Sequence, residues 1–323
     1  MHQQKKVFKE VTVDLSRVEK ELEKFLKVDD PILSQTCIYL LKAGGKRIRP
    51  GFTLLSGKFF DYSFERLLPV AMALEIIHMA TLVHDDVVDA SLTRRGRPTL
   101  SAAWGNSVSM ATGDFLFAKA LEIIVKIDDI TVSRELAKVC IQMGQGEIQQ
   151  IRSSYDVNQN YKQYLYRIKR KTALLIGLCC KLGAMVSRAD KRQVWILSTY
   201  GHCLGIAFQI VDDILDITAD PKILGKPVGG DIRQGIMTLP MIYALNYSSE
   251  NQRIRELLVK RDKTDEEVEE AVELIKRSGG IEESRKIVNL YIEKGIKNLK
   301  ELPDIPSRKA LIDLARFVAE RCY

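Results

Sequence analysis

Long segments with helical periodicity and no internal proline are the feature that most limits how this chain can fold. Near the N-terminus, Leu15, Val18, Leu22, Phe25 and Leu26 recur at three- and four-residue steps, which predicts an amphipathic helix. No segment alternates apolar and polar residues between hairpin turns, so no strands are predicted. The proline-free segments are residues 107–127, 132–153, 161–186 and 191–218, together with residues 65–89 apart from Pro69.

Glycine and proline mark where these helices should end. Gly44 and Gly45 predict a stop after a helix over residues 38–43, and Pro50 lies near the start of the next helix. Further breaks are predicted at residues 95–98, 156–160 and 220–235, and later helices at residues 251–260, 264–278, 281–301 and 306–320. Without a disordered linker or solenoid repeat, residues 1–323 are expected to form one all-α domain, a helical bundle with nearly apolar central helices.

Composition narrows the class of protein. Apolar residues make up 46% of the chain and charged residues 28%, as in ordinary globular proteins. The net charge of +7 suits a solubilising excess of basic residues or an anionic partner, but their scattered placement argues against nucleic acid. The six cysteines form no CxxC pair, residues 1–10 do not resemble a secretory signal, and no uncharged apolar run looks long enough to span a bilayer. A cytoplasmic protein is expected.

Two aspartate clusters share the same spacing, DDVVD at residues 85–89 and DDILD at residues 212–216. On a helix, Asp85 and Asp89 lie on one face one turn apart, and such like-charge pairs are destabilising. A single DxxxD pair is more often a solvated helix face. Two copies within apolar helices instead favour a hard cation such as Mg²⁺, held by few protein ligands and by substrate phosphate.

Basic motifs accompany the aspartates. They are GGKRIRP at residues 44–50, Arg94-Arg95 shortly after the first cluster, and RIKRKT at residues 167–172. Each alone is most simply a solvated charge run, and an isolated histidine such as His78 is more often a core residue. Beside metal-binding carboxylates they provide what a diphosphate requires, a metal on one side and cationic donors on the other.

These residues resemble the trans-prenyl diphosphate synthases, or polyprenyl diphosphate synthases. The resemblance runs in order through GGKRIRP, LEIIHMATLVHDDVVD, RRGRPT, TGDFL, GQGEIQQI, RIKRKTALLI, FQIVDDILD and GKPVGGDIRQGIMTLP. It implies the isoprenoid synthase fold, a farnesyl diphosphate synthase-like helical bundle around a central active-site cavity. More narrowly, the chain is similar to the catalytic component of two-component bacterial heptaprenyl or hexaprenyl diphosphate synthases, whose products become menaquinone side chains.

The resemblance also implies a role for particular residues. The catalytic set would be Asp85, Asp86, Asp89, Arg94, Lys171, Asp212 and Asp213. The Mg²⁺ ligands, for three ions with substrate bound, would be Asp85, Asp89, Asp212 and Asp216. The allylic diphosphate would contact Arg94, Lys171, Thr172, Gln209 and Lys226. Isopentenyl diphosphate would contact Lys46, Arg49, His78 and Arg95.

In this family, bulky aromatics just before the first aspartate cluster keep products short. Ala80 and Thr81 are small here, and Ile77 is aliphatic, so a long chain is expected. The family also implies ionisation of an allylic diphosphate followed by attack of the isopentenyl double bond.

Partners and alternatives complete these expectations. The resemblance implies a homodimer, or a heterodimer with a small helper subunit (component I), and at most peripheral membrane contact. A terpene cyclase of the same fold usually carries an NSE-type second metal motif, which DDILD replaces. A non-catalytic partner subunit typically loses the aspartates, and all six are present.

Overall fold

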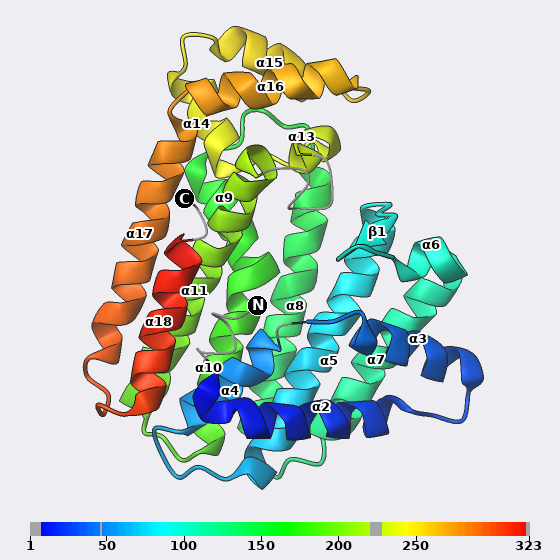
Figure 1. The fold of residues 1–323 in the computed structure, drawn as a ribbon, viewed down its shortest axis with the longest axis vertical. Helices are drawn as coiled ribbons and strands as arrows, with labels where there is room; N and C mark the ends of the chain where they lie inside the picture. The colour runs from blue at the N-terminus through cyan, green and yellow to red at the C-terminus, as the bar shows by residue number, and fades with distance from the viewer. Residues whose placement is uncertain (1–7, 46, 220–227, 321–323) are drawn as a thin grey trace. The chain divides into compact units, whose positions relative to one another are not determined.

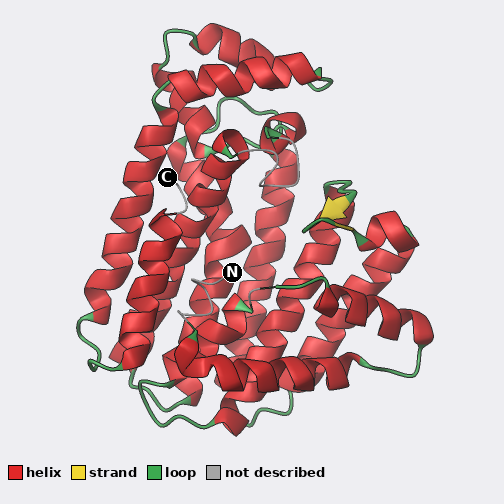
Figure 2. Ribbon diagram, viewed as in Figure 1, coloured by secondary structure: helices red, strands yellow, loops and turns green. Residues whose placement is uncertain are grey.

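The computed structural model describes residues 8–45, 47–219 and 228–320, and most of them are helical (Figure 2). The all-α prediction is therefore confirmed. The chain divides into two compact units, and several long helices continue from one unit into the other. The expectation that residues 1–323 act as one domain stays a prediction.

The first unit comprises Met1–Leu136, Leu178–Ser198 and Leu302–Leu311. Side-chain caps begin several of its helices; for example, the Leu33 N–H donates to Asp30 and the Arg66 N–H donates to Ser63. Its elements before the long crossing helices are η1 (Lys9–Val11), α2 (Thr12–Leu26), α3 (Pro31–Lys42), α4 (Ile48–Gly57), α5 (Phe64–Val88), α6 (Leu100–Trp104) and α7 (Asn106–Ile124) (Figure 1).

Helix α5 forms the core of this unit. It is buried almost all round between α4 and α7, as expected for a helix with no polar stripe. Pro69 lies in its second turn, where few backbone hydrogen bonds are lost. The amphipathic helix predicted near the N-terminus is α2, which buries Val18, Leu22 and Leu26.

The second unit comprises Ala137–Gly177, Thr199–Glu301 and Ile312–Tyr323. The helices that cross between units are α8 (Ile130–Arg152), α10 (Leu174–Val186), α11 (Lys191–Thr218) and α18 (Pro306–Glu320). Those wholly within the second unit are α9 (Tyr161–Ile168), the π-helical turn η2 (Lys169–Ala173), α13 (Gly230–Gln234), α14 (Leu239–Tyr247), α15 (Asn251–Val259), α16 (Asp265–Arg277) and α17 (Gly280–Leu299). The four helices predicted in the last third correspond to α15 to α18.

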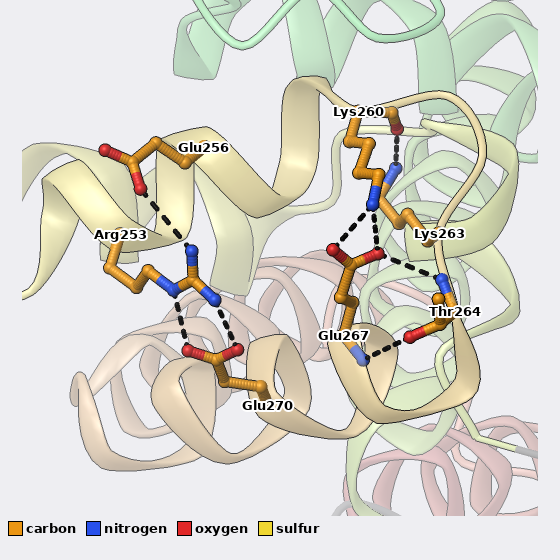
Figure 3. Close-up of polar contacts among 7 residues, drawn as sticks. All are labelled: Arg253, Glu256, Lys260, Lys263, Thr264, Glu267 and Glu270. Carbon is orange, nitrogen blue, oxygen red and sulfur yellow. Dashed lines mark hydrogen bonds and ion pairs between the residues drawn. The ribbon is translucent and has the colours of Figure 1, made fainter.

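Charged side chains join α15 to α16 across the surface, as Figure 3 shows. Arg253 donates to both carboxylate oxygens of Glu270 at 2.7 Å, and Lys260 donates to both oxygens of Glu267 at 2.6 and 2.8 Å. Glu267 also completes a capping box with Thr264 at the start of α16. Because these ion pairs are exposed to solvent, each adds little to the free energy of unfolding. Their main effect is to orient α15 and α16 relative to each other.

A small hairpin departs from the sequence expectation of no strands. Thr93–Arg94 (β1) pairs antiparallel with Arg97–Pro98 (β2). Two residues per strand are too few to show an alternating pattern, so the sequence carried only the signal of a turn.

Two core helices are long and apolar enough to pass for membrane spans. They are α5 and α11, with mean hydropathy of 1.6 and 1.4 over their most apolar windows. These windows are 67% and 61% buried inside the protein, which is the pattern of a core helix. The expectation that no uncharged apolar run is long enough to span a bilayer did not anticipate these two helices.

Gly183 on α10 lies directly against the backbone of α4, so Gly183→Ala should destabilise the protein. An added Cβ would lie 2.2 Å from the carbonyl oxygen of Thr53, and backbone yields little. We expect a loss of about 1–3 kcal/mol, measured by urea unfolding. Gly144→Ala on α8 is the control, since nothing lies within 4 Å of its added Cβ, and it should be neutral or slightly stabilising. Equal stability of the two variants would contradict this packing.

Candidate functional site

The first aspartate cluster lies at the C-terminal end of α5. Asp85 and Asp89 are half-buried, and the Asp89 N–H donates to the Asp85 carbonyl at 2.8 Å. The C-terminal end of a helix carries partial negative charge, which adds to the repulsion between carboxylates. A cation is therefore the favourable complement at this end of α5.

Asp86, the middle aspartate of the cluster, forms an ion pair with Arg94. It is 4% exposed, and Arg94 Nε donates to its two oxygens at 2.8 and 3.0 Å. Arg94 Nη2 lies 2.8 Å from Asp86 Oδ1. Asp86 thus anchors the β1–β2 hairpin to α5. The expected contact of Arg94 with an allylic diphosphate stays a prediction.

The hairpin turn holds Arg95 in an unusual backbone conformation. Arg95 has φ 54° and the following Gly96 has φ 74°, as a two-residue hairpin loop with matching twist requires. An arginine in the left-handed region costs roughly 1–2 kcal/mol relative to ordinary conformations. Strain of this kind gathers at functional sites, so it supports a role for the Arg95 side chain.

A small pocket of about 40 Å³ lies beside this hairpin, within the first unit. It brings together three residues that the sequence analysis assigned to substrates, namely His78, Arg94 and Arg95. Arg47, Glu75 and Asp86 also line it. Its arginines outnumber its carboxylates by one, so the charged side chains give this mostly apolar pocket a small net positive charge, which favours an anionic group.

His78 is uncharged in this setting. Its burial, and then the nearby Arg49 and Arg95, hold the pKa of the imidazole well below its usual value. A neutral His78 can donate one hydrogen bond to an anion while adding no positive charge. Arg49 acts on His78 through this field but does not line the pocket. Lys46 and Lys226, also assigned to substrates, lie outside the described residues.

The second aspartate cluster lies on α11, in the second unit. Asp212 is half-buried, whereas Asp213 and Asp216 are only 4% and 6% exposed. Both oxygens of Asp213 accept hydrogen bonds, from the Tyr164 hydroxyl at 2.6 Å and from Gln209 Nε2 at 2.9 Å. Burial raises the pKa of Asp213. Asp213 therefore organises neighbouring side chains.

This hydrogen-bonded chain continues to the RIKRKT motif. Thr172 donates to Gln209 Oε1 at 2.6 Å, so the orientation of the Gln209 amide is set from both sides. Thr172 and Lys171 lie on the π-helical turn η2, a distortion frequent at functional sites. Gly205 on α11 permits this turn to approach, because a Cβ there would lie 2.5 Å from the Cα of Ala173. The expected substrate residues Thr172 and Gln209 are thus brought together, while Nζ of the neighbouring Lys171 lies 3.6 Å from Glu147 Oε2.

Asp216 holds the segment that follows α11. Its Oδ2 accepts from the Asp231 N–H at 2.9 Å, and its carbonyl accepts from the Gly229 N–H at 2.7 Å. Asp216 thus anchors the start of α13. Its expected role as a metal ligand stays a prediction.

The carboxylates suit a magnesium ion. Asp85, Asp89 and Asp212 are the less buried members of the two clusters, and all their ligand atoms are oxygens. In the part of the chain that the structure describes, no group of three or more histidine, cysteine, aspartate or glutamate side chains is placed to hold a metal. Mg²⁺ commonly binds one or two carboxylates and completes its shell with water and phosphate, so the donor set fits.

The residues expected to control product length lie on the buried part of α5. Ala80 and Ile77 are 0% and 1% exposed. Thr81 is half-buried, and its hydroxyl donates to the His78 carbonyl at 2.8 Å. Their effect on product length stays a prediction.

Sequence reasoning missed three residues of these sites. Glu75 and Arg47 form a buried ion pair. Arg47 lies in the GGKRIRP motif but received no role, and the only signal for Glu75 was an acid within the apolar run of α5. Tyr164 carried no signal, because nothing in the sequence connects it with Asp213 on α11.

Tyr164→Phe should destabilise the protein. It removes the hydroxyl that Asp213 Oδ2 accepts from in a buried setting, and we expect a loss of about 1–3 kcal/mol by urea unfolding. The control is Tyr166→Phe on the same helix, because Tyr166 is 46% exposed and its ring contact with Arg170 survives. A Tyr164→Phe variant as stable as this control would argue against the Asp213 chain.

Residues 30–275 match the polyprenyl synthetase family profile. The chain is 43% identical over 310 residues to heptaprenyl diphosphate synthase component 2 of Bacillus subtilis, covering 96% of this chain and 88% of the relative. It is 44% identical to the protein of the same name from Geobacillus stearothermophilus, covering 96% of both.

Solved structures show the same likeness. Heptaprenyl diphosphate synthase from Staphylococcus aureus superposes with a TM-score of 0.92 at 38% identity, covering 97% of this chain and 99% of that one. A polyprenyl synthase from Caulobacter crescentus, complexed with calcium and isoprenyl diphosphate, has a TM-score of 0.94 at 33% identity, covering 99% and 98%. This chain has the isoprenoid synthase fold and belongs to the polyprenyl synthetase family.

Proposed function

We propose that this chain, a long-chain trans-prenyltransferase, condenses isopentenyl diphosphate with farnesyl diphosphate to make heptaprenyl or hexaprenyl diphosphate for menaquinone side chains. The observation that carries the proposal is the pocket lined by His78, Arg94 and Arg95, next to the half-buried Asp85 and Asp89. The relatives named heptaprenyl diphosphate synthase component 2 support the product length.

In this proposal, the pocket of the first unit takes the diphosphate of isopentenyl diphosphate. Arg95 supplies a charged fork at its wall, and His78 supplies a neutral donor. Arg49 adds positive potential, and Lys46 would contribute a further cation. Because these groups hold the diphosphate, the isopentenyl double bond is positioned to attack.

The allylic diphosphate would be held by the aspartates and by Lys171 and Thr172 on η2. Asp85, Asp89 and Asp212 would bind Mg²⁺, three ions in total with substrate, with Asp216 as a further candidate ligand. When bound, Mg²⁺ supplies positive charge that stabilises the departing diphosphate. Contacts to the same diphosphate would come from Arg94, Lys171, Thr172, Gln209 and Lys226.

The reaction then needs no protein nucleophile. The allylic C–O bond breaks to leave a carbocation and free diphosphate. The isopentenyl double bond forms a new carbon–carbon bond to that cation. A proton lost from the adjacent carbon, with the departed diphosphate as base, restores a double bond and completes one five-carbon extension.

The assembly is proposed from the relatives' names and from exposed apolar side chains. Component 2 implies a partner subunit, and we propose either a heterodimer with a small helper or a homodimer. Leu121 and Val125, at the end of α7 and just beyond it, are 58% and 72% exposed and offer an apolar contact. We further propose a cytoplasmic location with at most peripheral membrane contact.

Asp85→Ala should abolish most of the activity. With Mg²⁺, farnesyl diphosphate and radiolabelled isopentenyl diphosphate, incorporation into extractable product should fall roughly a hundredfold or more, because charge on the leaving group is no longer stabilised. Asp128→Asn, an exposed carboxylate outside the clusters, is the control and should retain full activity. Running the assay with and without a candidate helper also reads the product length. A wild-type chain that incorporates no label under either condition would contradict the proposed function.

Ala80→Tyr should shorten the product. Ala80 is fully buried on α5, so an aromatic ring there would occupy space that a growing prenyl chain needs. Reversed-phase chromatography of the dephosphorylated products should show a shift of several isoprene units. Products of unchanged length from a folded variant would remove Ala80 from control of chain length.

A further inference from the structure

Arg47 forms the centre of a partly buried network that joins three helices. Its Nη1 lies 3.2 Å from Glu75 Oε1 on α5, and its Nη2 lies 3.0 Å from Glu19 Oε1 on α2. Nη2 also donates to the Leu41 carbonyl on α3 at 2.7 Å. Arg47 is 8% exposed and Glu75 is 4% exposed, so their charges must be compensated by each other.

The backbone of Arg47 is left-handed, with φ 44°, immediately before α4. A residue other than glycine keeps this conformation only when its surroundings demand it. The demand comes from the guanidinium, because its contacts with Glu75, Glu19 and Leu41 hold the side chain in one place. Arg47 therefore ties the loop before α4 to α5.

That loop reaches the other functional arginine. A methyl group added at Gly45 would lie 2.8 Å from Nη1 of Arg47 and 3.1 Å from Nη1 of Arg95. The two guanidinium groups thus converge on Gly45, and Gly44, Arg47, Glu75 and Arg95 all line the same pocket. A shift of Arg47 would therefore change the space in which the Arg95 guanidinium lies.

Charge separates the arginines of this region into two kinds. Arg47 and Arg94 are compensated by Glu75 and Asp86, respectively. Among the described residues, no carboxylate lies within ion-pair distance of Arg49 or Arg95. An ion pair fixes the orientation of a guanidinium, as in Arg47 and Arg94, whereas Arg49 and Arg95 have no such carboxylate partner in the described part of the chain to orient them. Arg47 can therefore act as a scaffold for the neighbouring Arg95.

We propose that Arg47 and Glu75 are a positioning pair that sets the affinity of this pocket for isopentenyl diphosphate without affecting the allylic substrate. The proposal rests on the proposed function, in which this pocket takes isopentenyl diphosphate. It adds two residues that act through Gly45 and Arg95 and that touch neither the metal nor the allylic diphosphate.

The test compares Michaelis constants for the two substrates. Glu75→Gln removes the charge that orients Arg47, and Arg47→Lys replaces the fork by a single point of charge. Each variant should raise KM for isopentenyl diphosphate about ten- to a hundredfold, while KM for farnesyl diphosphate and kcat at saturation change less than about threefold. Glu19→Gln should have a small effect, because the Glu19 side chain is 56% exposed.

The matched controls are Arg253→Lys and Glu270→Gln, which alter an exposed arginine–glutamate pair far from any substrate residue in the sequence (Figure 3). They should leave both Michaelis constants unchanged. A purely structural role would lower thermal stability and kcat per total protein and would leave the ratio of the two constants unchanged. That outcome overturns the proposal, as does an unchanged KM for isopentenyl diphosphate.

Two features keep the test decisive. If Glu75→Gln does not yield folded protein by circular dichroism, Arg47→Lys carries the comparison, because it retains a buried cation opposite Glu75. Failure of the wild-type chain to incorporate isopentenyl diphosphate would instead contradict the proposed function. An active wild-type enzyme with unshifted variants would contradict the positioning pair alone.

Discussion

Buried charge that must be compensated is the constraint on which both functional regions of this protein depend. Each region places several ionised groups at or near apolar helices, where an uncompensated charge is strongly unfavourable. In the first unit, ion pairs compensate the buried carboxylates, with Arg47 paired to Glu75 and Arg94 paired to Asp86. In the second unit, Asp213 accepts hydrogen bonds from two neutral donors, the Tyr164 hydroxyl and the Gln209 amide. Asp85, Asp89 and Asp212 stay less buried and are among the residues expected to bind metal, whereas the expected ligand Asp216 is buried.

The same five-residue motif is therefore used in two ways. In both clusters the middle aspartate is buried and turned into a hydrogen-bond centre, while the first aspartate stays half-buried. Asp86 fixes a hairpin that carries Arg95, whereas Asp213 fixes the Gln209 amide and, through it, Thr172. The outer residue Asp216 differs from Asp89, because it anchors α13. Identical spacing gives the carboxylates a common helical face, but their neighbours decide what each one does.

Backbone strain and close packing accompany these pairings. Arg47 and Arg95 are both left-handed, and both guanidinium groups approach Gly45. The π-helical turn that carries Lys171 and Thr172 approaches α11 only because residue 205 is glycine. Such conformations persist when surrounding contacts are strong enough to hold them. Here those contacts are the arginine ion pairs and the hydrogen bonds that run from Asp213 through Gln209 to Thr172. The ion pairs and hydrogen bonds thus fix the orientation of side chains that are expected to contact substrate.

The sequence by itself determined the all-α class, most helix positions, the two aspartate clusters and the family, because helical periodicity and contiguous motifs are local properties. It did not reveal the hairpin at β1–β2, the π-helical turn or α14, whose local signals are short. Only the tertiary structure decided which aspartates are buried and which partners hold them. The Arg47–Glu75 pair joins residues 28 apart, and the Tyr164–Asp213 pair joins residues 49 apart. Contacts at such separations arise from the packing of helices, which no short stretch of sequence specifies.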